Sequence, residues 1–134
     1  IPLRKKSCLI YEYKCLCGIR YQGETMRPLE KRFHEHFDTP ACSLPVRSHS
    51  LSCEKFMEEF NKFKSAPNTL TKFKRKNTAL ATLLCEFAFE NNLISIIETN
   101  LDNYHERKTG EAFTIKLSDP YLNRQIKSKN VNFL

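Results

Sequence analysis

The pattern of residues 8–37 constrains the fold most, because it predicts a β-hairpin that is followed at once by an amphipathic helix. Cys8 to Lys14 is rich in β-branched and aromatic residues, which favour a strand, and Ile19 to Gly23 can return as its antiparallel partner. Gly18 marks the turn between the two strands. The loop of this hairpin contains two thiols, Cys15 and Cys17.

A helix is predicted directly after the hairpin, over about residues 28–37. Thr25 can act as its cap, and Pro28 suits the first helical turn. Three apolar residues of this segment recur at i, i+4 and i+8: Leu29, Phe33 and Phe37. This spacing places them on one face, so the helix is amphipathic.

The remaining pattern predicts four further regular elements. These are a helix over 54–64, an apolar helix over 78–91, a buried strand over 93–98 and a helix from Asp102 to about Lys116. Loops are predicted over 38–52, over 66–76, where the loop is mobile, and over 117–123, where it closes the domain. Three strands with helices around them form an α+β fold with a small antiparallel sheet. The 134 residues, 40% of them hydrophobic, suit a single domain over residues 1–134.

The chain is strongly basic, with a net charge of +7 and an isoelectric point near 9.2. Residues 61–84 contain no acidic residue, unlike an ordinary solvated face where both signs alternate. Such charge suits the phosphates of DNA, although a merely soluble basic domain is the alternative. The candidate DNA contacts are Arg27, Lys31, Lys72, Lys74, Arg75 and Lys76. No apolar run approaches the ~20 residues of a membrane span, so no membrane partner is expected.

The six cysteines do not suggest a disulfide framework. Cys15 and Cys17 are i, i+2 neighbours, which in a strand lie on one face and are poorly placed to bond to each other. The other four are scattered, and the core is large enough without covalent links. We therefore expect a reducing compartment.

A set of polar residues has the composition of a phosphodiesterase site: Tyr11, Tyr21, Arg32, His36, Glu111 and Asn123. Arg32 and His36 are spaced i, i+4, so they share one face of the predicted helix. A carboxylate can hold Mg²⁺, and a guanidinium matches phosphate oxygens. A phenol with a pKa near ~10 is a poor base unless a cation lowers its pKa or the proton passes through a relay. Taken singly, each residue has an ordinary structural interpretation, so the ordered set carries the prediction.

The run IYEYKCLCGIRYQGETMRPLEKRFHEH resembles the core of the GIY-YIG nuclease family. Leu9-Ile10-Tyr11 stands in the GIY place, Tyr21-Gln22-Gly23 in the YIG place, and Arg32 follows on the next helix. The segment ERKTGEAFTIKLSDPYLNR resembles the family's metal-binding Glu segment and terminal Asn. The cysteine pair in the hairpin, the GET after YQG, R-P-L-x-x-R-x-x-x-H and the EAxxIK…LN ending are similar to the endonuclease domain of Penelope-like retroelements. Leu9 and Gln22 depart from the motif at strand positions where side chains can vary.

The resemblance implies a function and a role for each site residue. Tyr11 is expected to be the general base or its relay, Tyr21 to position water or phosphate, and Arg32 to clamp the phosphate. His36 is expected to transfer a proton or contact phosphate, Glu111 to bind Mg²⁺ or Mn²⁺, and Asn123 to brace the site. The implied activity is nicking of nuclear DNA to prime insertion of the element. The chain would then be a piece of a longer reverse-transcriptase protein that also meets the element's RNA.

The Penelope-like pattern often includes a Cys/His zinc site, and this leaves two hypotheses open. Cys15 and Cys17 could join histidines in a Cys₂His₂ site, for which the candidates are His34, His36 and His49, with His34 and His49 preferred. Alternatively, these cysteines are ordinary thiols. The rival functional class is a non-catalytic basic nucleic-acid-binding module that is organised by a structural zinc.

Overall fold

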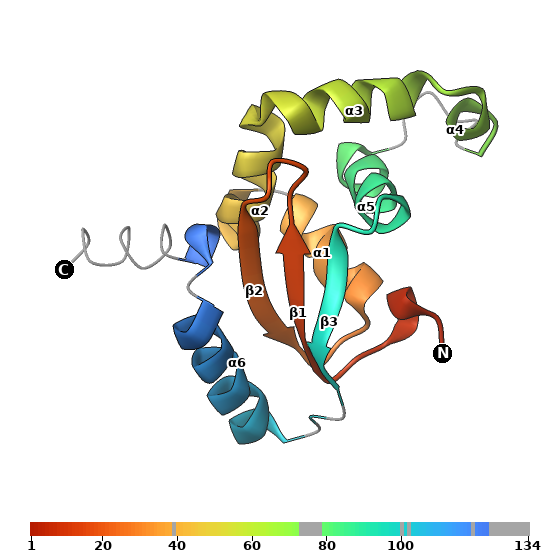
Figure 1. Ribbon diagram of the computed structural model, residues 1–134. Helices are drawn as coiled ribbons and strands as arrows, with labels where there is room; N and C mark the ends of the chain where they lie inside the picture. The colour runs from red at the N-terminus through yellow and green to blue at the C-terminus, as the bar shows by residue number, and fades with distance from the viewer. Residues whose placement is uncertain (39, 73–78, 100, 102, 119, 124–134) are drawn as a thin grey trace.

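The computed structural model of the protein describes residues 1–38, 40–72, 79–99, 101, 103–118 and 120–123. It contains a three-stranded antiparallel sheet flanked by helices, which confirms the predicted α+β class (Figure 1). The strands are β1 (Leu9–Lys14), β2 (Arg20–Thr25) and β3 (Ile94–Glu98). Their spatial order is β2-β1-β3, so the first strand is central and β2 and β3 lie at the edges.

The β1–β2 hairpin places its tyrosines on one face of the sheet. Tyr11 pairs with Gly23 across the hairpin, and Tyr13 pairs with Tyr21. Cross-strand partners point to the same face, so all three phenols share one face and the intervening residues point to the other. Gly18 has a φ of 92° at the turn, a conformation that glycine adopts without strain.

Two helices cover the tyrosine face, namely α1 (Leu29–Phe37) and α5 (Leu80–Glu90). The apolar residues of α1 are fully buried, as their spacing predicts: Leu29, Phe33 and Phe37. The Phe33 ring lies 5.0 Å from the Tyr11 ring and 6.2 Å from the Phe89 ring of α5, measured between centroids. This aromatic layer joins the sheet, α1 and α5, and it fixes the position of α1 over β1.

Three further helices follow α1: α2 (Pro40–Ser52), α3 (Glu54–Ser65) and α4 (Pro67–Lys72). The loops predicted over 38–52 and 66–76 are therefore wrong where α2 and α4 occur. Pro45 lies inside α2 and removes one backbone donor, but Val46 and Ser50 are fully buried on the same helix. The Ser50 hydroxyl and the Tyr13 hydroxyl share a hydrogen bond of 2.6 Å. Tertiary contacts thus hold a helix that local propensity does not favour.

The strand β3 is an edge strand, so the prediction of a buried strand is wrong. Ile94 is buried, but Ile97 is 41% exposed. The pairing with β1 shifts between Ile10 and Tyr11, which face Glu98 and Ile96 respectively. This bulge leaves the Ile97 side chain outside the alternation.

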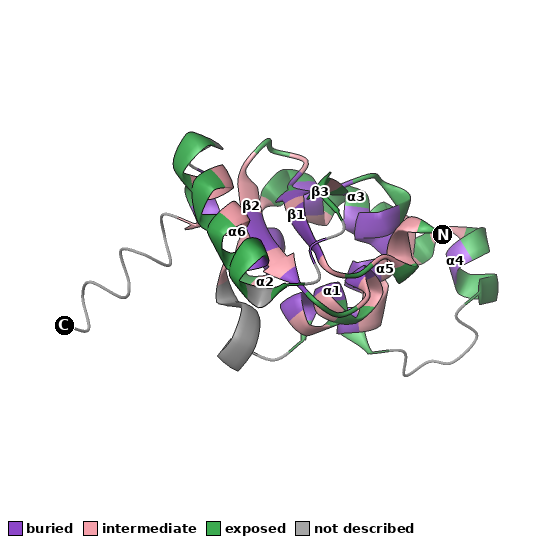
Figure 2. Cartoon of the chain, turned by 90° about the horizontal axis from the view of Figure 1, so that it is seen from below, coloured by how far each residue is buried: buried purple, intermediate pink, exposed green. Residues whose placement is uncertain are grey.

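The helix α6 (Tyr104–Ser118) lies near β2, on the side of the sheet opposite α1 (Figure 2). Ile10 points to this second face, and a Cβ atom on Gly110 of α6 would lie 2.8 Å from the Ile10 side chain. Glycine at this position therefore allows α6 to approach the sheet closely. A short 3₁₀ helix, Leu3–Lys5, precedes the sheet.

The cap of α1 differs from the predicted one. Thr25 ends β2, and its hydroxyl bonds the backbone of Arg27 instead of capping α1, whose N-cap residue is Pro28. Asp102 lies outside the described residues. The side-chain oxygen of Asn103 accepts backbone N–H groups of residues 105 and 106 at 2.8 and 3.3 Å, so Asn103 caps α6.

No helix in the described part of the chain combines the length and the apolar character that a membrane crossing requires.

Candidate functional site

The centre of the candidate site is the phenol of Tyr11, which crosses the backbone of β2 at Gly23. A Cβ atom on Gly23 would lie 2.5 Å from the Tyr11 oxygen and 3.2 Å from the Tyr21 ring. Only a residue without a side chain leaves room for both tyrosines here. The glycine of the YQG motif thus has a steric reason in this structure.

The helix α1 brings two polar side chains to the same phenol. The Nε atom of Arg32 donates to the Tyr11 oxygen at 3.2 Å, and Nε2 of His36 shares a hydrogen bond of 2.5 Å with it. The His36 ring also packs edge-on against Tyr21, with a centroid distance of 5.2 Å. The i, i+4 spacing of Arg32 and His36 thus converts directly into two contacts with one oxygen.

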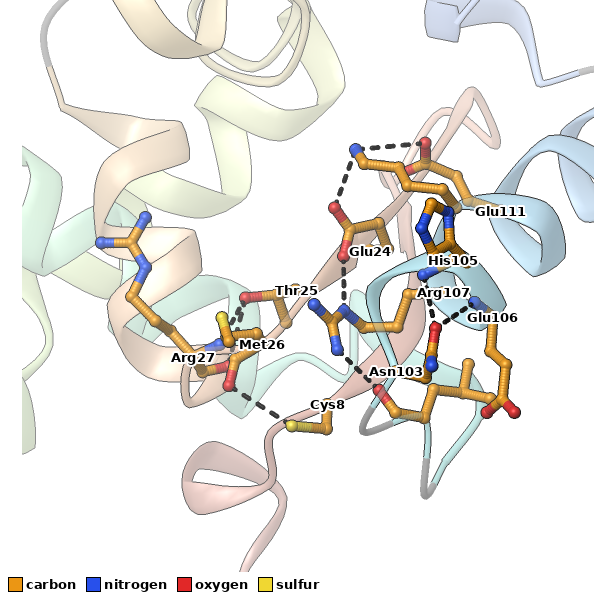
Figure 3. Close-up of polar contacts among 12 residues, drawn as sticks. Cys8, Glu24, Thr25, Met26, Arg27, Asn103, His105, Glu106, Arg107 and Glu111 are labelled. Atoms are coloured by element: carbon orange, nitrogen blue, oxygen red, sulfur yellow. Dashed lines mark hydrogen bonds and ion pairs between the residues drawn. The ribbon is translucent and has the colours of Figure 1, made fainter.

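Glu111 approaches from α6 at the free edge of β2. Its carboxylate accepts a hydrogen bond from the backbone N–H of Glu24, and its charge raises the pKa of both Tyr11 and Tyr21. Figure 3 shows Glu24 and Glu111 with their carboxylates turned toward a common position. Burial raises the pKa of Glu111, the Lys108 ammonium lowers it, and the charge of Glu24 raises it again. The carboxylate thus lies beside Glu24, one residue along β2 from Gly23, and 3.9 Å from the Lys108 ammonium.

Asn123 completes the set by binding the backbone of β2. Its Oδ1 accepts the Gln22 N–H at 2.7 Å, and its Nδ2 donates to the Gln22 carbonyl at 2.8 Å. These two bonds occupy a donor and an acceptor of an edge strand, as a neighbouring strand would. The side chain therefore holds the strand that carries Tyr21 and Gly23.

The six side chains divide into an interior pair, an exposed group and the brace. Tyr11 and His36 are 0% and 1% exposed, so neither contacts solvent appreciably. Tyr21 is partly exposed, and the Arg32 and Glu111 side chains are 24% and 23% exposed. A polyanion that approaches this surface can contact the partly exposed side chains of Tyr21, Arg32 and Glu111. Tyr11 and His36 are too deeply buried for direct contact.

Both phenols are protonated at neutral pH. Burial raises the pKa of Tyr11 well above its usual range, and the opposing effect of Arg32 is smaller. Burial likewise raises the pKa of Tyr21, with Arg32 again opposing. Burial, with the nearby Arg32 charge, lowers the pKa of His36 from 6.5 to about 3, so its imidazole is neutral at neutral pH. Its Nδ1 is buried without a hydrogen-bond partner among the described residues.

The buried neutral His36 predicts acid lability. Above pH 6.5 the imidazole is neutral in both the folded and the unfolded chain. As the pH falls, the unfolded chain takes up this proton first, so stability is lost progressively from pH 6.5 down to about pH 3. Between about pH 7 and pH 5 we expect His36 to reduce the unfolding free energy by about 2 kcal/mol. Urea unfolding at the two pH values measures this loss.

The controls are His36→Gln, which removes the titrating group, and His34→Gln, which removes an exposed one. The His34 variant should keep the full loss, while the His36 variant should show a loss smaller by the stated amount. Contributions of carboxylates and thiols cancel in this comparison. Equal losses in all three proteins would show that His36 is not held neutral in the folded state.

A second cluster lies at the tip of the hairpin, where β1 and β2 meet the junction of α2 and α3 (Figure 1). It contains three thiols and one imidazole whose ligand atoms all lie within 4.8 Å of one another: Cys15, Cys17, His49 and Cys53. The sulfur of Cys17 lies 3.2 Å from Nε2 of His49. Such a group could hold a metal ion.

The cluster differs from the predicted metal ligands in two residues: it contains Cys53, which was not predicted, and it does not contain His34, which was. Cys53 is the N-cap residue of α3. Burial raises its pKa, but hydrogen bonds from the backbone of Phe56, from the thiols of Cys15 and Cys17 and from the backbone of residue 55 outweigh burial and lower it. The ring of His34 bonds Thr82 at 3.1 Å instead. His34 lies on the outer side of α1, because its helical position differs from that of His36 by two residues.

The predicted DNA contacts are only partly described. Lys74, Arg75 and Lys76 lie outside the described residues. Lys31 is exposed on α1, and Arg27 pairs with Glu35 at 2.6 Å. Lys72 on α4 reaches α5, at 3.3 Å from Glu86. Arg27 lies two residues after the end of β2 and pairs with Glu35, which also pairs with Arg32 of the site. Lys72 is turned toward α5 instead.

Comparisons with family models, with curated proteins and with solved structures find no match for this chain.

Proposed function

We propose that this chain is a divalent-metal-dependent DNA endonuclease of the GIY-YIG type. The observation that carries the proposal is the cluster of Tyr11, Tyr21, Arg32 and His36 at Gly23 of β2. The Glu111 carboxylate of α6 accepts a hydrogen bond from the backbone N–H of Glu24, the next residue of the same strand. The motif resemblance orders these residues along the chain, and the fold brings them together. DNA phosphodiesters are the proposed substrate, in keeping with the net charge of +7.

In this proposal Arg32 binds the scissile phosphate. Its planar guanidinium can donate two parallel hydrogen bonds to phosphate oxygens, and its Nε is already held by Tyr11. Tyr21 packs against His36 on the same helix as Arg32, and because burial raises its pKa it remains a neutral phenol that could orient the attacking water. The buried pair of Tyr11 and His36 serves as the relay and support behind these groups. Direct contact between His36 and phosphate has no support, because the ring is 1% exposed.

Glu111 is the proposed carboxylate for Mg²⁺ or Mn²⁺. The proposal is supported by the chemistry of the donors, because the carboxylates of Glu24 and Glu111 supply the hard oxygen ligands that such an ion takes, and both lie near one position, at 2.8 and 3.9 Å from the Lys108 ammonium. Bound metal would supply Lewis-acid stabilisation of charge on the phosphate. Glu111 is oriented for this role by the Glu24 backbone N–H.

The four-residue cluster at the hairpin tip is proposed to hold zinc as a structural ion. Three thiolates and one imidazole are a common zinc set, and a Zn–S distance of about 2.3 Å implies ligand separations near about 3.7 Å. The observed upper limit of 4.8 Å requires only small side-chain movements. The ion would fix the β1–β2 loop to the ends of α2 and α3.

The biological setting is proposed from the resemblance alone. A nick that leaves a 3′-hydroxyl in nuclear DNA would prime reverse transcription by the rest of a Penelope-like element's protein. Element RNA would then be a partner of the parent protein.

A plasmid-nicking assay tests the proposal. The zinc-loaded wild type is expected to relax supercoiled DNA with Mg²⁺ or Mn²⁺, and EDTA should stop the reaction. Glu111→Gln removes the charge that holds the metal but keeps the shape of the side chain. We expect nicking to fall at least about a hundredfold while DNA binding, measured by fluorescence anisotropy, persists.

Glu106→Gln is the matched control, since Glu106 is an exposed carboxylate on the same helix. It should nick at the wild-type rate. Normal nicking by Glu111→Gln would refute the assignment of the metal carboxylate. A wild-type protein that binds DNA and zinc but never nicks would support the rival, a non-catalytic nucleic-acid-binding module, which the thiol cluster also fits.

A further inference from the structure

A lysine occupies the cation position of the proposed active site. The Nζ atom of Lys108 lies 2.8 Å from one oxygen of Glu24 and 3.9 Å from one oxygen of Glu111. Lys108 and Glu111 are i, i+3 neighbours on α6, whereas Glu24 comes from β2. The ammonium therefore joins the two carboxylates, and in Figure 3 dashed lines run from Glu24 and from Glu111 to one nitrogen.

The other oxygen of Glu24 is held by a second cation. Nε of Arg107 donates to it at 3.0 Å, and Nη1 of Arg107 donates to the Leu101 carbonyl at 2.8 Å. The Arg107 side chain is 3% exposed and the Glu24 side chain 13% exposed, so burial holds this ion pair in place. Lys108 differs from Arg107, because its side chain is 44% exposed and has solvent into which it can turn.

We propose that Lys108 is an internal stand-in for the divalent ion, which must displace this ammonium from between Glu24 and Glu111 before it can bind. The inference rests on the proposed function and adds a residue that sets the metal affinity of the site. In the metal-free protein the ammonium offsets the repulsion between the two carboxylates. When the ion enters, Lys108 turns outward and Glu24 stays on Arg107.

The physical reason is competition for one position. A divalent ion held between Glu24 and Glu111 would lie against the ammonium of Lys108, and the two charges would repel each other. The ammonium lies 2.8 Å from Glu24 and 3.9 Å from Glu111, so it offsets the charge of both carboxylates. The apparent metal affinity is therefore the intrinsic affinity reduced by the cost of moving Lys108.

Manganese binding to the full 134-residue chain, saturated with zinc, tests the inference. Electron paramagnetic resonance of free Mn²⁺ gives the dissociation constant without reference to cleavage. Lys108→Met keeps the apolar stem and removes the charge, and we expect Mn²⁺ to bind about five- to tenfold more tightly. Lys108→Arg keeps the charge and should bind no more tightly than the wild type. Melting curves without metal confirm that both variants fold.

Glu111→Gln separates the inference from the proposed function. If the wild type binds Mn²⁺ in a manner that requires Glu111, and Lys108→Met leaves the dissociation constant unchanged or raises it, Lys108 is no competitor and only the inference fails. If no protein shows binding that depends on Glu111, the metal site itself fails and both proposals fall. Tighter binding in Lys108→Met that disappears in the Lys108→Met, Glu111→Gln double variant supports both.

Discussion

Arg32→Ala is expected to abolish DNA nicking, with a loss of about 10³-fold or more, while the protein remains folded. The guanidinium is the only partly exposed cation that bonds the Tyr11 oxygen in the described part of the chain, with its Nε at 3.2 Å. In the proposed mechanism its loss removes the phosphate clamp at the position where charge develops. Rates of plasmid relaxation under single-turnover conditions measure this effect directly.

Arg27→Ala provides the matched control for this variant. Arg27 and Arg32 both pair with Glu35, at 2.6 and 3.7 Å, but only Arg32 reaches Tyr11. Loss of Arg27 should weaken DNA binding and lower the salt dependence by about one phosphate contact, with a near-normal rate at saturating protein.

Arg32→Lys distinguishes geometry from charge. Lysine keeps the positive charge but loses both the fork and the Nε–H donor, so we expect it to recover little of the lost rate. A lysine variant that nicks as well as the wild type would show that only charge is needed. Equal losses in the Arg27 and Arg32 variants would place the catalytic phosphate elsewhere.

The hairpin and α1 could be predicted because their signals are local. The β-branched and aromatic run of β1, the turn at Gly18 and the i, i+4, i+8 apolar spacing of α1 each act within a few residues. The structure agrees with each, apart from shifts of one or two residues at the ends. Local pattern and tertiary structure are consistent here, as expected where the core is built.

The helix α2 and the exposure of β3 could not be predicted, because distant residues decide them. The two prolines of α2 indicate a loop, but Val46 enters the core and Ser50 bonds Tyr13 from the central strand. LISIIE has the composition of a buried strand, yet its position at the sheet edge depends on the order β2-β1-β3. Neither the burial of α2 against the central strand nor the edge position of β3 can be recognised from the neighbouring residues in the sequence.

The candidate site shows the same division. The order of Tyr11, Tyr21, Arg32 and Glu111 along the chain was visible as a motif, whereas the complete burial of Tyr11 was not. The position of Lys108 between two carboxylates follows from the packing of α6 against β2, more than eighty residues away. Only coordinates show such a contact.

The fourth residue of the thiol cluster was missed for a different reason. A Cys₂His₂ pattern directs attention to histidines, and the chain offers the spacing His49-x₃-Cys53 instead. That spacing places both residues at a helix junction, with His49 near the end of α2 and Cys53 at the start of α3. A search for any Cys or His pair three to five residues apart would have found it.

Cys53→Ser is expected to release the proposed zinc and to lower the melting temperature by about 10 °C or more. The thiol of Cys53 stands at the N-terminus of α3, where backbone N–H groups favour its thiolate, so serine removes one of the three thiolate ligands of the set. Without the ion, the hairpin loop loses its connection to α2 and α3. Elemental analysis should find one zinc per wild-type chain, and calorimetry gives the melting temperature.

Cys8→Ala is the matched control, because its thiol bonds the Met26 carbonyl outside the cluster. It should keep zinc and melt within a few degrees of the wild type. A wild-type protein that contains no zinc, and whose melting temperature is unchanged in Cys53→Ser, would refute the structural ion. A mass lower by two hydrogen atoms would then indicate a disulfide among the three thiols.

The cluster holds the loop that joins β1 to β2, so the ion is also expected to support the proposed nuclease site. A zinc-specific chelator should slow nicking in parallel with the loss of folded protein, even with Mg²⁺ in excess.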